Sequence, residues 1–438
     1  MISNDLEFRT VSRLPSFQRL ITVFDMTRLG ISLLCLFCMT PAWGKDWPQF
    51  RGSDGQGHAE EGVQVPLQWS PNKHVAWKVK ISGKGWSSPV VVGDRVYVTT
   101  AVASEKGLSL RALALGMADG ETLWDQEIFA RPEVGEFHKK NSHASPTPIM
   151  EDGKLYAHFG HQGTACLNAV DGKVLWKQES LEYPPLHGNG GSPILFEDKL
   201  IFSCDGTKDP FIVALNKSTG EIVWKTNRGV EVSRTFSFST PLAIEVDGRW
   251  QIVSPASGAV IAYDPSNGKE IWRCLYGEGY SVVPRPLFAH GLVYVCSGFD
   301  SAKLLAIDPA GKGDVTKTHL KWTIDKRIPK ESSPIIVGEQ LYANDDKGIV
   351  SCFDAKSGKQ VWQKRIDGGG GYSGSPVYAA GHLFFHNGDG ITTVIKPGET
   401  FKQVAENKIG EFGLSSFAVV DDGFVIRTES SLLRLRKP

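Results

Sequence analysis

The chain has 438 residues, and its 48 Lys and Arg residues balance 48 Asp and Glu residues, so the formal net charge at pH 7 is zero. This balance argues against a nucleic-acid-binding protein that works by bulk electrostatic attraction. The hydrophobic content of 41% excludes global disorder, and 47 Gly, 24 Pro and 12 Trp residues indicate many short strands and turns.

Residues 1–44 have the pattern of an export signal. Arg28 precedes a short apolar run over residues 29–40, and the small-residue pattern Ala42-Trp43-Gly44 follows it. The run is short for a transmembrane helix, although a membrane anchor is the alternative. We expect Met26 to be the true start, residues 1–44 to be an N-terminal extension plus signal peptide, and residues 45–438 to form a single domain. The mature chain is then periplasmic or otherwise extracytoplasmic, with no transmembrane segment.

Tryptophan recurs at intervals of 40 to 52 residues. The repeated positions are Trp77, Trp124, Trp176, Trp224, Trp272, Trp322 and Trp362. A period of this length is typical of propellers and solenoids. No stretch after residue 45 has a helical period, which disfavours a helical solenoid.

Each repeat has the same internal order. It opens with a small or hydroxyl residue and Pro, and then gives two apolar runs joined by a turn, as in SSPVVVGDRVYVTT over residues 87–100. A third run leads to a Gly four residues before the Trp. That Gly suits a left-handed turn position. Each unit is therefore a four-stranded antiparallel blade with the Trp on its outer strand.

The count of units predicts an all-β, eight-bladed β-propeller. Seven units are complete, and residues 412–437 supply three more strands without a fourth. The missing outer strand is found at residues 74–80, ahead of the first complete unit. The N- and C-terminal strands would then close the last blade together and remove the open sheet edges.

Small hydroxyl residues recur where the innermost strands begin. These positions are Ser88, Thr147, Ser192, Thr240, Ser333, Ser375 and Ser416, and Arg285 takes the eighth. Crowding of the inner strands explains small residues without any ligand. Arg285 is a candidate for binding a carboxylate, and a salt bridge to Glu278 is the alternative.

The loops that lead into the inner strands gather polar side chains on one face. Besides Arg285, the candidate ligand-binding residues are Arg234, His143, His187, Tyr280, Lys330 and Glu331, with His138 beside them. Function on a rigid scaffold usually lies in such loops. The histidines come from two blades, so we expect no metal site. The five cysteines after residue 44 form no CxxC and no adjacent pair, which indicates buried structural thiols.

These repeats resemble the quinoprotein-like, or PQQ-repeat, eight-bladed β-propeller superfamily over residues 46–438. The Trp-bearing strands resemble its tryptophan-docking motif, and the opening segment DWPQFRGSDGQG resembles the leader of exported PQQ-repeat proteins. The superfamily includes PQQ-dependent alcohol dehydrogenases and the propeller subunit of the outer-membrane β-barrel assembly machinery. The resemblance to the dehydrogenases would imply PQQ and Ca²⁺ on the axis. The adjacent cysteine pair of those enzymes is absent here, and no complete Ca²⁺ ligand set can be carried over.

We therefore expect a non-catalytic binding or assembly scaffold that acts through its loop face. Its partner would be an envelope or other extracytoplasmic protein, or a small polar ligand, with no cofactor and no nucleic acid. The alternative is a PQQ- and calcium-dependent dehydrogenase that oxidises an alcohol or a sugar.

Overall fold

The computed structural model describes residues 45–300, 302–366 and 369–437. They belong to one compact unit over residues 43–438. Met26 and the expected signal peptide lie outside the described residues. Within them the regular structure is β-sheet, apart from the 3-10 turn η1 (Gly160–Gln162). No helix among them has the length and apolar character needed to span a membrane.

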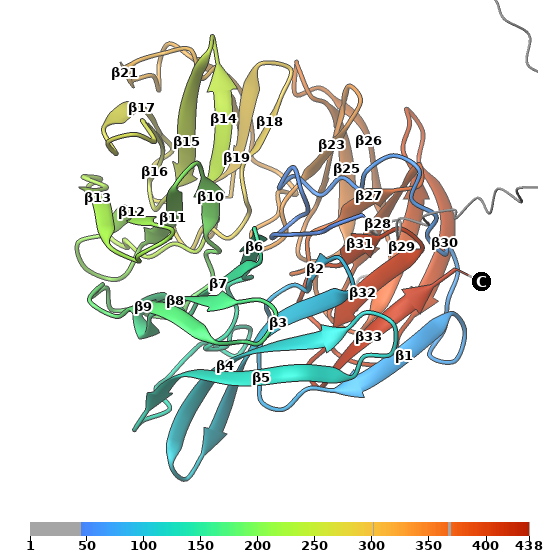
Figure 1. Ribbon diagram of the computed structural model, residues 1–438. Helices are drawn as coiled ribbons and strands as arrows, with labels where there is room; N and C mark the ends of the chain where they lie inside the picture. Colours follow the sequence, from blue (N-terminus) through green and yellow to red (C-terminus); the bar gives the residue numbers. More distant parts are fainter. Residues whose placement is uncertain (1–44, 301, 367–368, 438) are drawn as a thin grey trace, which may run out of the picture. The chain divides into compact units, whose positions relative to one another are not determined.

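Eight antiparallel sheets follow one another around a ring, so the expected eight-bladed β-propeller is confirmed (Figure 1). Strands run from the axis to the rim in each blade. Blade 1 is β2 (Val90–Val92), β3 (Arg95–Ser104), β4 (Gly107–Gly116) and β5 (Thr122–Arg131). Blade 2 is β6 (Ile149–Glu151), β7 (Lys154–His158), β8 (Thr164–Asn168) and β9 (Val174–Gln178). Blade 3 is β10 (Ile194–Phe196), β11 (Lys199–Cys204), β12 (Phe211–Asn216) and β13 (Ile222–Asn227). Blade 4 is β14 (Leu242–Val246), β15 (Arg249–Pro255), β16 (Ala259–Tyr263) and β17 (Glu270–Leu275).

The second half of the ring repeats this order. Blade 5 is β18 (Leu287–Ala289), β19 (Leu292–Cys296), β20 (Leu304–Ile307) and β22 (Leu320–Ile324). Blade 6 is β23 (Ile335–Val337), β24 (Gln340–Asn344), β25 (Ile349–Asp354) and β26 (Gln360–Arg365). Blade 7 is β27 (Val377–Ala379), β28 (His382–His386), β29 (Ile391–Lys396) and β30 (Lys402–Lys408). Blade 8 is β31 (Ala418–Val420), β32 (Gly423–Arg427), β33 (Ser431–Arg436) and β1 (Val75–Lys80).

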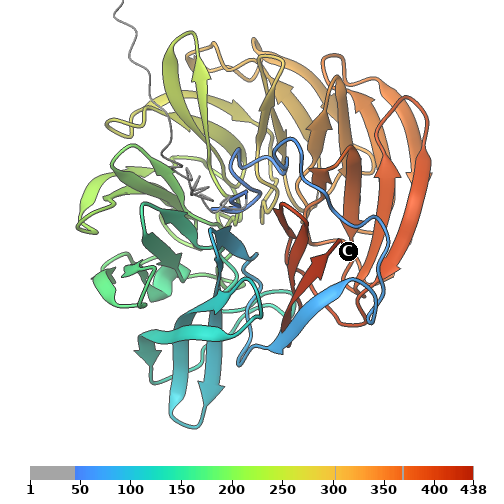
Figure 2. The ribbon, with the colours of Figure 1, turned by 45° about the vertical axis from the view of Figure 1, so that its right-hand side comes forward.

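Strands from opposite ends of the chain close the ring, as the sequence predicts. β1 pairs antiparallel with β33, with Val79 opposite Leu432. Figure 2 shows β1 in light blue beside the red C-terminal strands. Blade 8 therefore has its fourth strand, and β33 has no free edge.

The hydrophobic core is divided among the gaps between neighbouring blades. One cluster joins blades 1 and 2, for example, and another joins blades 2 and 3. Middle strands such as β11 and β12 are buried along nearly their whole length, whereas the outer strand β13 is mostly exposed. A strand that is buried on both faces reads as a continuous apolar run, which is the pattern in the sequence repeats.

The repeated tryptophans pack each blade against the next. Trp124 of blade 1 lies over Gly172 of blade 2, where an added Cβ would come within 2.8 Å of the indole. Its Nε1–H donates to the carbonyl of Ala169 in the same blade at 3.1 Å. Gly172 also has a φ of +74°, so it combines the predicted left-handed turn with the space that the ring needs. Trp77, Trp176, Trp224, Trp322 and Trp362 also donate to a backbone carbonyl of the following blade.

Blade 4 departs from the four-stranded pattern. The short strand β21 (Gly313–Asp314), from the connection between β20 and β22, pairs parallel with β17 and makes a fifth strand. Here Trp272 is fully buried, and its Nε1–H donates to the side chain of Gln251 within its own blade. Thr318 stands four residues before Trp322, where the other complete units have Gly. The seat for Trp272 is therefore built differently.

Candidate functional site

Hydrogen bonds link the innermost strands into a nearly closed ring around the axis. The N–H of Ser88 donates to Oγ1 of Thr147 in the next blade, and the N–H of Thr147 donates to Oγ of Ser192, both at 2.9 Å. This contact repeats at seven of the eight steps. We call the seven acceptors the hydroxyl ring: Ser88, Thr147, Ser192, Thr240, Ser333, Ser375 and Ser416. Besides being small, these residues hold neighbouring blades together.

Arg285 takes the eighth position, and its guanidinium turns to backbone carbonyls. Nε donates to the carbonyl of Pro241 at 3.1 Å and Nη1 to that of Phe50 at 2.7 Å. Arg285 is buried, and burial lowers its pKa to about 10. The alternative of a salt bridge to Glu278 is not what the structure shows, because Glu278 accepts from the N–H and hydroxyl of Ser233. A role for Arg285 in ligand binding stays a prediction.

The segment Trp47–His58, which we call the N-terminal plug, closes one end of the axis. It contacts the inner strands of five blades through Val91, Met150, Phe288, Ile336 and Tyr378. Each of these residues lies three positions beyond its ring position, so the plug is one layer further along the axis than the hydroxyl ring. Figure 2 shows this part of the chain in dark blue near the centre of the blades.

Arg51 anchors the plug. Its Nη2 donates to the carbonyl of Pro334 at 2.9 Å, and Nη1 lies 3.4 Å from the carbonyl of Pro376. These prolines directly follow ring residues, so the guanidinium satisfies carbonyls that face the axis. Arg51 is buried, and burial lowers its pKa to about 9 against the opposing effect of Asp54.

A cavity of about 270 Å³ occupies the axis on the other side of the hydroxyl ring. Residues from eight connecting segments, which we call the inlet loops, line it. They span residues 81–89, 132–148, 179–193, 228–241, 276–286, 325–334, 366–376 and 409–417. Six ring hydroxyls and Phe50 of the plug form its inner end, and Trp86, Phe238, Tyr280, Phe299 and Leu414 contribute apolar surface.

Charged and polar side chains surround the mouth of this cavity. Nζ of Lys140 lies 2.6 Å from Oε1 of Glu331, and the other carboxylate oxygen of Glu331 accepts from Ser373. The rings of His138 and His187 are 5.3 Å apart, centroid to centroid. Burial and the neighbouring His138 lower the pKa of His187. The mouth therefore carries a neutralised ion pair and a pair of imidazoles.

The structure brings only part of the predicted set together. His138, His187, Tyr280 and Glu331 line the cavity. Arg234 lies beside it, where its guanidinium is 4.4 Å from the centroid of the Tyr280 ring and forms an ion pair with Asp300.

His143 and Lys330 lie apart from the cavity lining. His143 is buried against Phe137, with 4.8 Å between ring centroids, and burial lowers its pKa. Lys330 lines a separate hollow that also includes Asp346, and its ammonium is 5.3 Å from the Phe299 ring.

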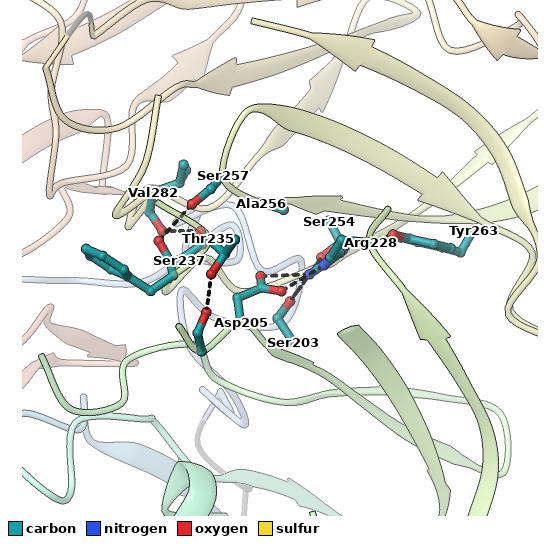
Figure 3. A network of polar contacts seen from close by, with 12 residues as sticks. Ser203, Asp205, Arg228, Thr235, Ser237, Ser254, Ala256, Ser257, Tyr263 and Val282 are labelled. Carbon is teal, nitrogen blue, oxygen red and sulfur yellow. Dashed lines mark hydrogen bonds and ion pairs between the residues drawn. The ribbon is translucent and has the colours of Figure 1, made fainter. Parts of the chain in front are cut away.

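A buried polar network supports the inlet loops at residues 228–241 and 276–286 (Figure 3). The guanidinium of Arg228 forms two hydrogen bonds with Asp205, at 2.8 and 2.9 Å, and Nη2 also contacts Ser203 and Ser254. Burial pulls the pKa of Arg228 down, and the Asp205 carboxylate and Tyr263 more than offset it.

The backbone beside Asp205 extends this support to the cavity. The N–H of Ser237 donates to the Asp205 carbonyl at 3.2 Å, and the Ser237 hydroxyl donates to the carbonyl of Val282 at 3.2 Å. Both loops therefore hold their cavity-lining residues on a rigid base.

This arrangement is suited to binding. Among residues 45–300, 302–366 and 369–437, no group of three or more His, Cys, Asp or Glu side chains is placed to hold a metal ion. The five cysteines there are buried free thiols. Glu331 is the one carboxylate that lines the cavity, and both of its oxygens are already bonded.

Several lining residues were missed by the sequence analysis. Lys140 and Ser373 lie in polar loops and are recognisable only once their partner Glu331 is placed. Trp86 and Leu414 precede ring positions by two residues, which is a signal that the repeat register contains. The place of Phe50 depends on the path of the plug, and no repeat marks it.

Comparison with known proteins places the chain among PQQ-repeat propellers. A family model described as outer membrane protein assembly factor BamB matches residues 67–203 and 208–437. A protein of that description from Burkholderia pseudomallei is 25% identical over 66% of this chain and 58% of its own length. A tetrathionate hydrolase of Acidithiobacillus ferrooxidans is 24% identical over 81% of this chain and 64% of its own length. The chain thus spans less than two thirds of both relatives.

A solved structure agrees with the fold. The quinohemoprotein alcohol dehydrogenase from Comamonas testosteroni matches with a TM-score of 0.64 and 12% identity, over 90% of this chain and 81% of that one. At this identity, the likeness shows the propeller fold alone.

Proposed function

The chain belongs to the family described as outer membrane protein assembly factor BamB, and from this premise we propose that it is a scaffold in outer membrane protein assembly. The family match over nearly the whole propeller is the observation that carries the proposal. The scaffold would bind other assembly proteins over the face formed by the inlet loops.

The composition of that face supports a protein partner. Leu186, beside His187, is 52% exposed, and Phe412, which packs edge-on against Trp86, is 41% exposed. Arg234 and Lys140 add charge nearby. Apolar anchors within a charged surround are the usual composition of a transient protein interface.

We further propose that the chain is exported and acts without catalysis. The signal-peptide pattern before Lys45 supports export, and the BamB relatives support a role in the envelope. The five thiols that follow are unpaired in the structure. The absence of a catalytic role rests on the cavity lining, where no nucleophile–base pair is assembled by the described residues.

The PQQ-dependent dehydrogenase is the weaker candidate. Calcium in such a site needs six to eight oxygen ligands, several of them carboxylates. The cavity offers Glu331, already bonded to Lys140 and Ser373, and the amide of Asn141. The residues present therefore do not fit a calcium-bound quinone, and we derive no chemical step through it.

Site-specific photo-crosslinking in the organism that makes the protein tests the scaffold role. A photoreactive residue at Leu186 or Phe412 should yield adducts with outer membrane assembly proteins. The same residue at Val361, which is 39% exposed on the outer strand β26, is the matched control. Adducts equal at all three positions, or none with an assembly protein, would overturn the proposal.

A further inference from the structure

The axial cavity has unused hydrogen-bond donors at its inner end. Each ring hydroxyl accepts a backbone N–H from the preceding ring position, and no described residue accepts its O–H hydrogen in return. Six of these hydroxyls line the cavity, and all six are more than nine-tenths buried: Ser88, Thr147, Ser192, Thr240, Ser375 and Ser416. The Nε1–H of Trp86, another buried lining residue, has no partner among the described residues either. Buried donors without acceptors favour a ligand that is rich in acceptors.

Uncompensated positive charge lies one layer beneath these donors. The guanidiniums of Arg51 and Arg285 bond to the carbonyls of Pro334 and Pro241, each of which directly follows a ring residue. Asp54 is the one carboxylate that acts on both arginines, and it is already bonded to His58 at 2.6 Å. The inner end of the cavity is therefore electropositive, and a buried anion there would be stabilised.

The apolar walls and the mouth define the rest of the ligand. Trp86, Phe238 and Leu414 give surface for a hydrocarbon or aromatic group. Glu331 at the mouth repels a second negative charge, so the anionic end is directed inward. The Lys140–Glu331 contact across the mouth leaves room for a compact molecule rather than a polypeptide chain.

We propose that the axial cavity binds a small organic carboxylate, with the carboxylate against the hydroxyl ring and its apolar part between Trp86, Phe238 and Leu414. This site goes beyond the assembly role. The cavity lies inside the inlet-loop face, so either result below leaves the crosslinking test of that face unaffected.

Calorimetric titration of the full chain with benzoate and 2-naphthoate tests the site, with benzamide and 2-naphthamide as neutral counterparts of the same shape. A carboxylate accepts charge-assisted hydrogen bonds and an amide does not, so we expect the amides to bind about tenfold more weakly or worse. Thr240→Val removes one ring donor and should weaken the carboxylates while leaving the amides unchanged. A general structural disturbance would weaken both.

A cavity-filling variant locates the binding. Val283 lines the cavity and its side chain takes no part in the ring, so Val283→Trp should abolish carboxylate binding. Val361→Trp, on the exposed face of β26, is the matched control and should bind as the wild type does. Unaltered melting temperatures show that both variants fold. The absence of saturable binding by either carboxylate at millimolar concentration, amides that bind equally well, or full binding by Val283→Trp would each overturn the proposal.

Discussion

The ammonium of Lys140 lies 2.6 Å from a carboxylate oxygen of Glu331, and this contact joins the inlet loops of blades 2 and 6. In a ring of eight these blades stand opposite each other, so the pair crosses the mouth of the axial cavity. A contact between opposite blades is distinct from the neighbour-to-neighbour packing that holds the rest of the propeller together.

A double-mutant cycle measures this contact. Lys140→Ala and Glu331→Gln should each lower the free energy of unfolding slightly, with a coupling of about 0.2–1 kcal/mol, because the Lys140 side chain is 44% exposed. The coupling should shrink in high salt. Glu331→Gln keeps an acceptor for Ser373, which isolates the charge. Strictly additive single variants in urea unfolding at low salt would contradict a bridge in solution.

The seat of Trp124 predicts a large effect from one methyl group. Gly172→Ala places a Cβ 2.8 Å from the indole at a φ of +74°, so we expect a loss of about 2–4 kcal/mol in the free energy of unfolding. Gly153→Ala is the matched control, because Gly153 has a φ of +71° and nothing within 4 Å of its Cβ position. It should lose about 1 kcal/mol, from the backbone alone. Equal losses in denaturant titrations would show that Trp124 does not occupy the space in solution.

The repeat made most of the fold predictable. Blade number, strand order and the closure by residues 74–80 follow from a spacing that recurs seven times. Even the Gly before each Trp was recognisable as a left-handed turn. What the spacing does not contain is the second use of Gly172, because its contact comes from Trp124 of the preceding blade. The departure at Trp272 follows from Thr318 and β21, an insertion particular to one blade.

The site was less predictable because it depends on a segment outside the repeat. Arg285 stands out in the sequence as the break in the hydroxyl series, but its partners Phe50 and Pro241 were not deducible. The plug crosses the axis with non-repeating turns, such as the positive φ of Arg51. Polar residues in the inlet loops were correctly grouped on one face. Their individual directions depend on local packing, which separated His143 and Lys330 from the cavity.

Closure of blade 8 predicts the effect of a truncation. A chain that begins at Ile81 lacks the plug and β1, so β33 loses its partner strand and becomes an exposed edge. We expect a lower melting temperature and concentration-dependent association in light scattering. A chain that begins at Lys45 keeps both elements and serves as the control. Equal melting temperatures of the two chains would argue against closure by β1.

The buried pair of Arg228 and Asp205 predicts an asymmetry between single and double variants. Both side chains are inaccessible, at 1% and 0% exposure. Asp205→Ala leaves a buried guanidinium without its carboxylate, which should cost about 3–5 kcal/mol. Asp205→Leu combined with Arg228→Met removes both charges and should recover much of this loss. A double variant in urea unfolding that is as unstable as the sum of the singles would contradict this account.

The buried histidines predict a loss of stability in acid. Burial lowers the pKa of His386 to about 4 and that of His158 to about 3, whereas an unfolded histidine titrates near 6.5. Because the folded pKa is depressed, the unfolded state binds the proton first. The stabilising contribution is therefore complete above pH 6.5 and falls as the pH drops towards 4. Each histidine adds about 1.4 kcal/mol per pH unit to the slope within this window. Urea unfolding of His386→Gln should show a slope smaller by one proton between pH 6 and pH 4. The exposed His382→Gln should keep the wild-type slope. An unchanged slope in His386→Gln would mean that His386 is already accessible to protons in the folded protein.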